Sequence, residues 1–201
     1  MIPSADGQTA KPALRAAALA RRDALGRPER AAASEAIATR AIAILTAAGP
    51  SVVAAYRAIR SEVDPAAIAD WALGQRIAVA LPAVSGGDSL VFRTYRPGEP
   101  LTDAGFGTVA PGSQVPEVDP DVIVVPLAAF DRAGHRLGYG RGFYDRGVAR
   151  LRERGLAPLT LGLAFAVQEV DAIAREPHDV RLDFVVTENE TIDFRVTVSE
   201  A

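Results

Sequence analysis

Residues 121–146 read DVIVVPLAAFDRAGHRLGYGRGFYDR, and this stretch decides the fold class. Its first part, residues 121–126, is a short run of mainly β-branched apolar residues. Such a run is typical of a strand that is buried on both faces of a sheet. A glycine-rich loop follows, and residues 142–154 then have the pattern of a helix. The order of strand, loop and helix predicts a βα unit.

The same alternation of strands and helices continues on both sides of this unit. Apolar runs predict further strands at residues 51–56, 76–81, 89–95, 159–165, 183–187 and 191–196. Helical periodicity predicts helices at residues 11–25, 28–48 and 65–74. Because the central strands are continuously apolar, we expect an α/β fold: a mostly parallel central sheet with helices on both faces, in a single domain. In such sheets ligands bind beyond the carboxyl ends of the strands.

The two ends of the chain and one internal segment lack this pattern. Residues 1–10 are expected to be a flexible tail, so that the domain covers residues 11–201. Residues 96–120 are rich in glycine and proline and predict a long irregular segment. No apolar run reaches the roughly 18 residues of a membrane span, and no signal sequence is recognisable. We therefore expect a cytoplasmic protein.

The composition excludes several classes of function. A net charge of -3 indicates neither a nucleic-acid partner nor a membrane partner. There is no cysteine, which excludes disulfides, thiolate nucleophiles and cysteine-based metal sites. Two histidines are too few for a site with several histidine ligands. A bound metal should therefore be a hard ion such as Mg²⁺, held by carboxylates and phosphates.

The glycine-rich loop that follows the strand at residues 121–126 has the features of a phosphate site. Gly138, Gly140 and Gly142 alternate with larger residues, so that consecutive N–H groups can surround an anion. The following helix adds the attraction of its N-terminal dipole. The loop is neither a Walker A motif nor a Rossmann fingerprint. A tight turn with surface arginines is the alternative interpretation.

Charged and aromatic side chains flank these glycines. Arg136 and Arg141 supply positive charge for a phosphate. Asp145 follows the glycines at a point where a carboxylate can hold Mg²⁺ together with phosphate oxygens. Phe143 and Tyr144 offer flat faces for a heteroaromatic ring.

This loop closely resembles the signature of a known family. The signature P-x-x-x-F-D-x-x-G-x-R-L-G-x-G-x-G-[YF]-Y-D belongs to the 5-formyltetrahydrofolate cyclo-ligases, also called methenyltetrahydrofolate synthetases. The similarity runs from Lys11 to about Glu188. It includes KPALR at residues 11–15, YRAIRSEVD at residues 56–64, and EPHDVRLDFVVTE at residues 176–188.

The resemblance implies a role for each matching residue. It implies ATP binding by Lys11, Arg15, Arg136, Leu137, Gly138, Tyr139, Gly140, Arg141, Gly142, Phe143 and Tyr144. It implies substrate binding by Tyr56, Arg57, Glu62, Tyr139, Gly140, Arg141, Gly142 and Phe143. It assigns catalysis to Arg141 and Asp145, and Mg²⁺ to Asp145 and Asp183.

The resemblance also implies the reaction. The expected activity is the Mg²⁺- and ATP-dependent cyclisation of 5-formyltetrahydrofolate to 5,10-methenyltetrahydrofolate, through phosphorylation of the formyl oxygen. ADP and phosphate are the other products. The expected partners are therefore a reduced folate and ATP, with no nucleic acid and no membrane, and the protein is expected to be a monomer.

One departure from the family pattern leaves alternatives open. Many relatives carry Gly-[IV]-x-Glu-Pro in the long loop, whereas residues 107–111 read GTVAP, with Ala110 in place of the glutamate. The alternatives are a related ATP-dependent enzyme of folate or thiamine pathways, a non-catalytic folate or nucleotide sensor, and a sugar-phosphate binder. No turnover of 5-formyltetrahydrofolate with Mg-ATP would favour the first, binding of both ligands without phosphate release the second, and no binding of any reduced folate the third.

Overall fold

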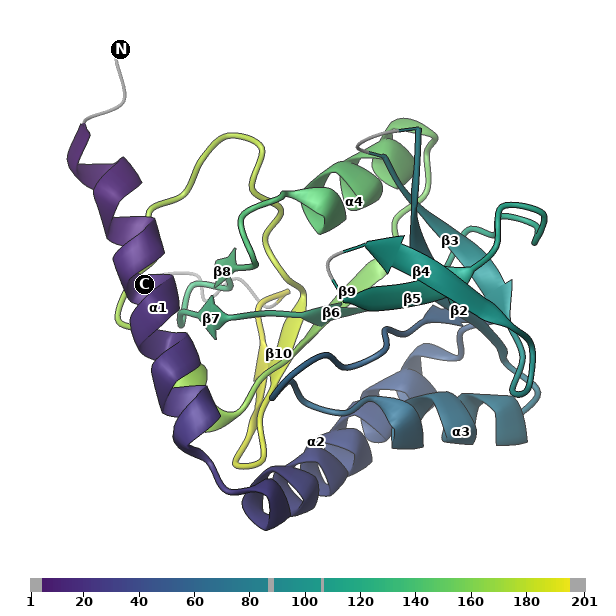
Figure 1. Ribbon diagram of the computed structural model, residues 1–201, viewed down its shortest axis with the longest axis horizontal. Coiled ribbons are helices and arrows are strands. Elements are labelled where there is room, and N and C mark those ends of the chain that lie inside the picture. The colour runs from purple at the N-terminus through teal and green to yellow at the C-terminus, as the bar shows by residue number, and fades with distance from the viewer. Residues whose placement is uncertain (1–4, 87–88, 106, 196–201) are drawn as a thin grey trace.

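The computed structural model describes residues 5–86, 89–105 and 107–195, and these residues form the α/β fold expected from the sequence (Figure 1). The helices are α1 (Ala5–Ala24), α2 (Arg27–Ala48), α3 (Ala66–Gly74), α4 (Phe143–Glu153) and the 3-10 helix η1 (Ala166–Gln168). The strands are β1 (Val52–Ala54), β2 (Ala78–Ser85), β3 (Ser89–Tyr95), β4 (Leu101–Gly105), β5 (Thr108–Pro111), β6 (Val122–Pro126), β7 (Ala129–Phe130), β8 (Arg136–Leu137), β9 (Leu159–Leu163), β10 (Phe184–Val186) and β11 (Thr191–Asp193).

Seven strands form the central sheet, in the order β11-β10-β9-β6-β1-β2-β3. The five inner strands are parallel to one another, while β3 and β11 run antiparallel at the two edges. The prediction of a mostly parallel sheet is therefore confirmed. β6, whose residues 122–125 are all buried, lies near the centre, as its apolar run indicated.

Helices cover both faces of this sheet. Figure 1 shows α2 and α3 on one side of the sheet and α4 on the other. The core between α2 and the sheet contains Ile37, Ala38, Ala41, Leu45, Val53, Val122, Val124, Leu161, Leu163, Phe184 and Val186. The core between α4 and the sheet contains Ala54, Ile123, Val125, Leu127, Val148, Leu151 and Val185. Each large apolar side chain buried in this way contributes about 1.5–3 kcal/mol to folding.

The first helix begins earlier than the sequence suggested. α1 starts at Ala5, so the backbone of residues 5–10 is helical where a tail was expected, and residues 1–4 lie outside the described residues. α1 stands beside β7 and β8 in Figure 1. Its inner face packs Leu14 and Ala18 against Leu137 and Ile173.

The second helix is apolar enough to have a second interpretation. By length and composition α2 could cross a membrane, which the sequence analysis did not foresee. In the fold, however, Ile37, Ala41 and Leu45 are fully buried against the sheet. Their spacing of four residues places them on one face of the helix. α2 is a core helix of this domain.

Residues 96–120 are more regular than predicted. β4 and β5 form an antiparallel hairpin in this segment. Ala110 of β5 is buried in an apolar cluster with Ala83 and Val91, and Arg93 donates to the carbonyl oxygens of Ser113 and Val115. The prediction of an irregular segment was wrong here because short strands between glycines and prolines carry little periodicity.

The topology brings two distant segments to one edge of the sheet. β1 and β6 are parallel neighbours, although β2 follows β1 in the chain. The strand order therefore reverses between β1 and β6, which is where ligands bind in sheets of this type. Residues 56–64 follow the carboxyl end of β1, and the segment that contains β7, β8 and then the glycine loop follows that of β6. Both segments carry predicted site residues.

Candidate active site

The glycine loop joins β8 to α4 and is anchored at both ends. Leu137 is buried against Ala18 of α1, so its side chain is part of the core. Gly140 has φ 89°, and Gly142, which caps the N-terminus of α4, has φ 62°. Residues that carry a Cβ rarely adopt these positive φ values. The first N–H groups of α4 have no acceptor within the helix and can bind an anion. The geometry suits the predicted phosphate site.

The basic residues of α1 converge on this loop. Arg15 Nε donates to the carbonyl oxygen of Gly138 at 2.6 Å, and its guanidinium lies close to Gly140. Lys11 is one helical turn away on the same face of α1 and points toward residues 176–179. Although 123 residues separate Arg15 from Gly138 in the sequence, the fold places them in contact.

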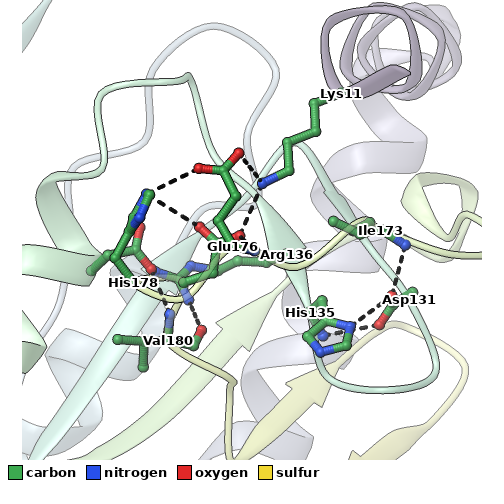
Figure 2. Close-up of polar contacts among 10 residues, drawn as sticks. Lys11, Asp131, His135, Arg136, Ile173, Glu176, His178 and Val180 are labelled. Atoms are coloured by element: carbon green, nitrogen blue, oxygen red, sulfur yellow. Dashed lines mark hydrogen bonds and ion pairs between the residues drawn. The ribbon is translucent and has the colours of Figure 1, made fainter. Parts of the chain in front are cut away.

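Lys11 is held by two carboxylates. Its Nζ lies 2.9 Å from Glu176 Oε1 and 2.9 Å from Asp179 Oδ2, as Figure 2 shows for Lys11 and Glu176. Burial lowers the pKa of Lys11, but the hydrogen bonds to both carboxylates outweigh this, so the pKa is raised. Burial raises the pKa of Asp179, but the Glu176 N–H and Lys11 outweigh it, so this pKa is lowered. Lys11 is therefore fully charged.

The same cluster has the composition of a metal site. Glu176, His178 and Asp179 offer ligand atoms within 4.8 Å of one another. The Lys11 ammonium, however, already contacts two of the three residues (Figure 2). A cation here would have to displace the lysine. These carboxylates thus orient Lys11 in the described structure.

Asp145 lies in the first turn of α4, where the sequence placed it. Its Oδ1 accepts hydrogen bonds from Arg136 Nη2 at 2.7 Å and from the Val180 N–H at 2.9 Å. Arg136 also donates to the carbonyl oxygen of Val180. Within the described part of the chain, no hydrogen bond reaches Asp145 Oδ2. Arg136 thus orients Asp145. A direct contact between Arg136 and ATP stays a prediction.

The second predicted magnesium ligand is engaged elsewhere. Asp183 precedes β10, and its Oδ2 accepts hydrogen bonds from the N–H and the Oγ1 of Thr160 at 2.8 and 2.7 Å. These bonds join the first residues of β9 and β10. The structure therefore gives Asp183 a structural role, and its metal role stays a prediction.

Glu62 and Tyr139 are brought together from the two segments at the carboxyl ends of β1 and β6. The Tyr139 hydroxyl donates to Glu62 Oε1 at 2.7 Å, and the Ile59 N–H donates to Oε2 at 2.9 Å. Burial raises the pKa of Glu62, and these hydrogen bonds only partly oppose the shift. Burial and the charge of Glu62 raise the pKa of Tyr139 to about 12. Tyr139 therefore keeps its proton and acts as a donor.

A buried arginine completes this group. Arg22 of α1 is 1% exposed; its Nη1 donates to the Tyr139 hydroxyl at 3.1 Å and its Nε to Ser61 Oγ at 3.0 Å. Ser61 in turn donates to Asp23. The sequence analysis missed Arg22. The available signal was an arginine four residues after Ala18, on the apolar face of α1.

The other predicted substrate residues border a small pocket. Tyr56 and Arg57 help to line a cavity of about 170 Å³ at the carboxyl ends of β1 and β2. The Tyr56 hydroxyl donates to the carbonyl oxygen of Val63 at 2.7 Å, within the fold. Ligand pockets usually measure about 300–1,000 Å³. This cavity alone is too small for a folate.

The aromatic residues after the loop are packed against the sheet. Phe143 and Tyr144 are partly buried beside the core under α4, and the Arg146 guanidinium lies 5.3 Å from the Phe143 ring centre. Burial raises the pKa of Tyr144. Arg141, between the last two glycines, is exposed. The roles of these residues in binding and catalysis stay predictions.

A second missed residue, Asp131, fixes the turn between β7 and β8. It is 2% exposed, and its carboxylate accepts hydrogen bonds from the N–H groups of Ala133, His135 and Ile173 at 3.0, 2.9 and 2.9 Å. His135 Nδ1 lies 3.1 Å from Oδ2 (Figure 2). Asp131 thereby ties the start of the glycine loop to the segment that leads to Glu176. The motif F-D-x-x-G contained this residue, but its spacing did not reveal the role.

Comparisons with known proteins identify the family. A family model described as the 5-formyltetrahydrofolate cyclo-ligase family matches residues 7–188. The chain is 31% identical to the 5-formyltetrahydrofolate cyclo-ligase of Escherichia coli (strain K12) over 141 residues, which cover 67% of this chain and 76% of that protein. It is 38% identical to the enzyme of the same name from Haemophilus influenzae over 97 residues, 46% of this chain and about half (51%) of that protein.

Solved structures with the same fold carry a related name. The NMR structure of Aquifex aeolicus 5,10-methenyltetrahydrofolate synthetase matches with a TM-score of 0.78 and 29% identity, covering 95% of this chain and 96% of that one. A 5,10-methenyltetrahydrofolate synthetase from Mycoplasma pneumoniae matches with a TM-score of 0.71 over 89% of this chain and 98% of that one. Its identity of 24% supports the fold alone.

Proposed function

The chain belongs to the 5-formyltetrahydrofolate cyclo-ligase family, and we propose that, in the presence of Mg²⁺, it converts 5-formyltetrahydrofolate and ATP into 5,10-methenyltetrahydrofolate, ADP and phosphate. The observation that carries the proposal is the contact of Arg15 with the glycine loop at Gly138. It brings the basic residues of α1 to the glycine loop, whose backbone N–H groups lead into the first turn of α4. A triphosphate needs that combination of charge and donors.

The chemistry requires activation of a poor leaving group. The oxygen of the formyl group on N5 attacks the γ-phosphorus of ATP, and ADP leaves. N10 then attacks the formyl carbon and loses its proton, and the C–O bond breaks to release phosphate. The protein has to hold the two substrates in line and stabilise negative charge on the transferred phosphoryl group.

Each part of the site has a proposed share in this work. Lys11, Arg15 and Arg141 neutralise the triphosphate, and the N–H groups at Gly140 and Gly142 orient it. Glu62 accepts hydrogen bonds from the pterin ring, since its buried carboxylate lies at the carboxyl end of the sheet. We also place the protein in the cytoplasm and expect it to act as a monomer.

Magnesium belongs to the proposal as well. Asp145 leaves its Oδ2 clear of hydrogen bonds among the described residues, and Asp183 uses only Oδ2 for Thr160. Carboxylate oxygens are the ligands that Mg²⁺ prefers, so Asp145 would hold the ion through Oδ2, and Asp183 would contribute only through the oxygen that does not bind Thr160. When bound, the ion would supply positive charge beside the phosphates.

Turnover with the two substrates tests the proposed function. We expect the protein, mixed with 5-formyltetrahydrofolate and Mg-ATP, to produce the near-ultraviolet absorbance of the methenyl product and one phosphate per product. The enzyme-free cyclisation that acid promotes is subtracted. Binding of both ligands without phosphate release would instead identify a sensor, and no binding of a reduced folate would indicate a sugar-phosphate binder.

Lys11→Ala should weaken the use of ATP more than that of folate. The loss of one charge-assisted contact with the triphosphate should raise the KM for ATP about 10- to 100-fold. The KM for 5-formyltetrahydrofolate should change much less. The control is Arg96→Ala, which removes one charge from a side chain that is 75% exposed and paired with Glu99. Wild-type KM values in Lys11→Ala would show that the role of this lysine is misassigned.

A further inference from the structure

The Tyr139 hydroxyl bridges a buried donor and a buried acceptor. It accepts a hydrogen bond from Arg22 Nη1 at 3.1 Å and donates one to Glu62 Oε1 at 2.7 Å. Arg22 is 1% exposed and Glu62 is 9% exposed, whereas Tyr139 is 37% exposed. The tyrosine therefore reaches in from the surface, and its hydroxyl covers two polar groups of the interior.

Without the tyrosine, Arg22 Nη1 would lose its acceptor and Glu62 Oε1 would lose its donor. Arg22 makes its other side-chain hydrogen bond to Ser61, and its nearest carboxylate in the described structure, Asp23, is 3.8 Å away. A buried guanidinium and a buried carboxylate are costly unless each is hydrogen-bonded. A ligand that displaces Tyr139 must therefore bring both an acceptor for Arg22 and a donor for Glu62.

A lactam has that pair of groups. In a lactam the carbonyl oxygen accepts and the adjacent N–H donates, in the same order as the two roles of the Tyr139 hydroxyl. The pterin ring of a reduced folate carries a lactam, with its oxygen at C4 and its hydrogen at N3. The 4-amino counterpart of this ring has a donor at C4 and no hydrogen at N3.

We propose that Tyr139 occupies the lactam subsite of the ligand-free protein and that Arg22 determines specificity by binding the C4 oxygen of the pterin after Tyr139 moves aside. The inference rests on the proposed function, since that function supplies the pterin. Glu62 then accepts from N3. Gly138 and Gly140, on either side of Tyr139, give the backbone freedom for this movement, and Gly140 already has φ 89°.

Two variants separate the two parts of the proposal, and both are measured by calorimetric binding, so that no turnover is needed. Tyr139→Phe removes the competing hydroxyl and should tighten the binding of 5-formyltetrahydrofolate by about 2- to 10-fold. Arg22→Lys keeps the positive charge. An ammonium group, however, lacks the planar fork of N–H donors with which the guanidinium would bind Ser61 and the ligand at the same time. It should weaken the binding of 5-formyltetrahydrofolate by about 10- to 100-fold and that of its 4-amino counterpart much less.

Arg21→Lys is the matched control for Arg22→Lys. Arg21 is the preceding residue of α1 and docks this helix on the carbonyl oxygens of Val167 and Glu169. The Arg21→Lys substitution should leave the preference for the 4-oxo ring over the 4-amino ring unchanged. Binding of a non-hydrolysable ATP analogue by each variant shows that its fold is intact.

Three results would overturn the inference. They are unchanged or weaker folate binding by Tyr139→Phe, equal losses for the 4-oxo and 4-amino ligands in Arg22→Lys, or the same loss in Arg21→Lys. If Arg22→Lys does not fold, the result for Tyr139→Phe decides. Wild-type protein that binds 5-formyltetrahydrofolate but forms no methenyl product would contradict the proposed function and leave the lactam subsite standing.

Discussion

Asp145→Asn is expected to lower kcat about 100- to 1,000-fold, the size of effect seen when one group that stabilises transition-state charge is removed. The asparagine keeps an oxygen for the hydrogen bonds from Arg136 and the Val180 N–H, so the fold around it should persist. It loses the negative charge that we propose for binding Mg²⁺. Steady-state kinetics at increasing Mg²⁺ concentration should therefore show partial rescue.

The control for this variant is Asp70→Asn, an exposed carboxylate of α3. Its kcat should equal that of the wild type at every Mg²⁺ concentration. An Asp145→Asn protein with wild-type kcat would remove Asp145 from the catalytic site. A loss of activity that is accompanied by a lower melting temperature would instead point to a structural role through the ion pair with Arg136.

Asp131→Ala is expected to lower the free energy of unfolding by about 3–5 kcal/mol, since breaking a buried charged contact leaves its partners unsatisfied. The N–H groups of Ala133, His135 and Ile173 would lose their acceptor together. Typical domains are stable by only about 5–15 kcal/mol, so much of the folded population would be lost on mild heating. Chemical denaturation measures the change.

A surface ion pair gives the matched comparison for Asp131. Asp119 makes two hydrogen bonds to Arg154, both at 2.7 Å, but the two side chains are 41% and 49% exposed. Asp119→Ala should therefore cost at most about 1 kcal/mol. If the two variants were equally stable, the turn between β7 and β8 would not depend on its buried carboxylate.

The parts of the fold that depend on short-range patterns could be predicted from the sequence. The buried run at residues 122–126 became β6, and residues 89–95 became β3 with the predicted bounds. The helix predicted at residues 28–48 became α2, which ends at Ala48 with Gly49 as its αL C-cap. The helix predicted to begin at residue 142 became α4, with Gly142 as its N-cap.

Contacts between distant segments could not be predicted from local patterns. That Lys11 pairs with Glu176 and Asp179, more than 160 residues away, depends on how α1 packs against β7 and β8. The burial of Arg22 depends on the same packing. Predicting these pairs would need either the tertiary fold or the observation that a charge interrupts the apolar face of α1.

The central claim is that α1 and the glycine loop bind one triphosphate between them. A crystal structure of the complex with a non-hydrolysable ATP analogue tests it most directly. We expect phosphate oxygens within hydrogen-bond distance of Lys11 Nζ, of the Arg15 guanidinium and of the backbone N–H groups between Gly140 and Phe143. A triphosphate bound away from α1, with Lys11 still paired to Glu176 and Asp179, would contradict it.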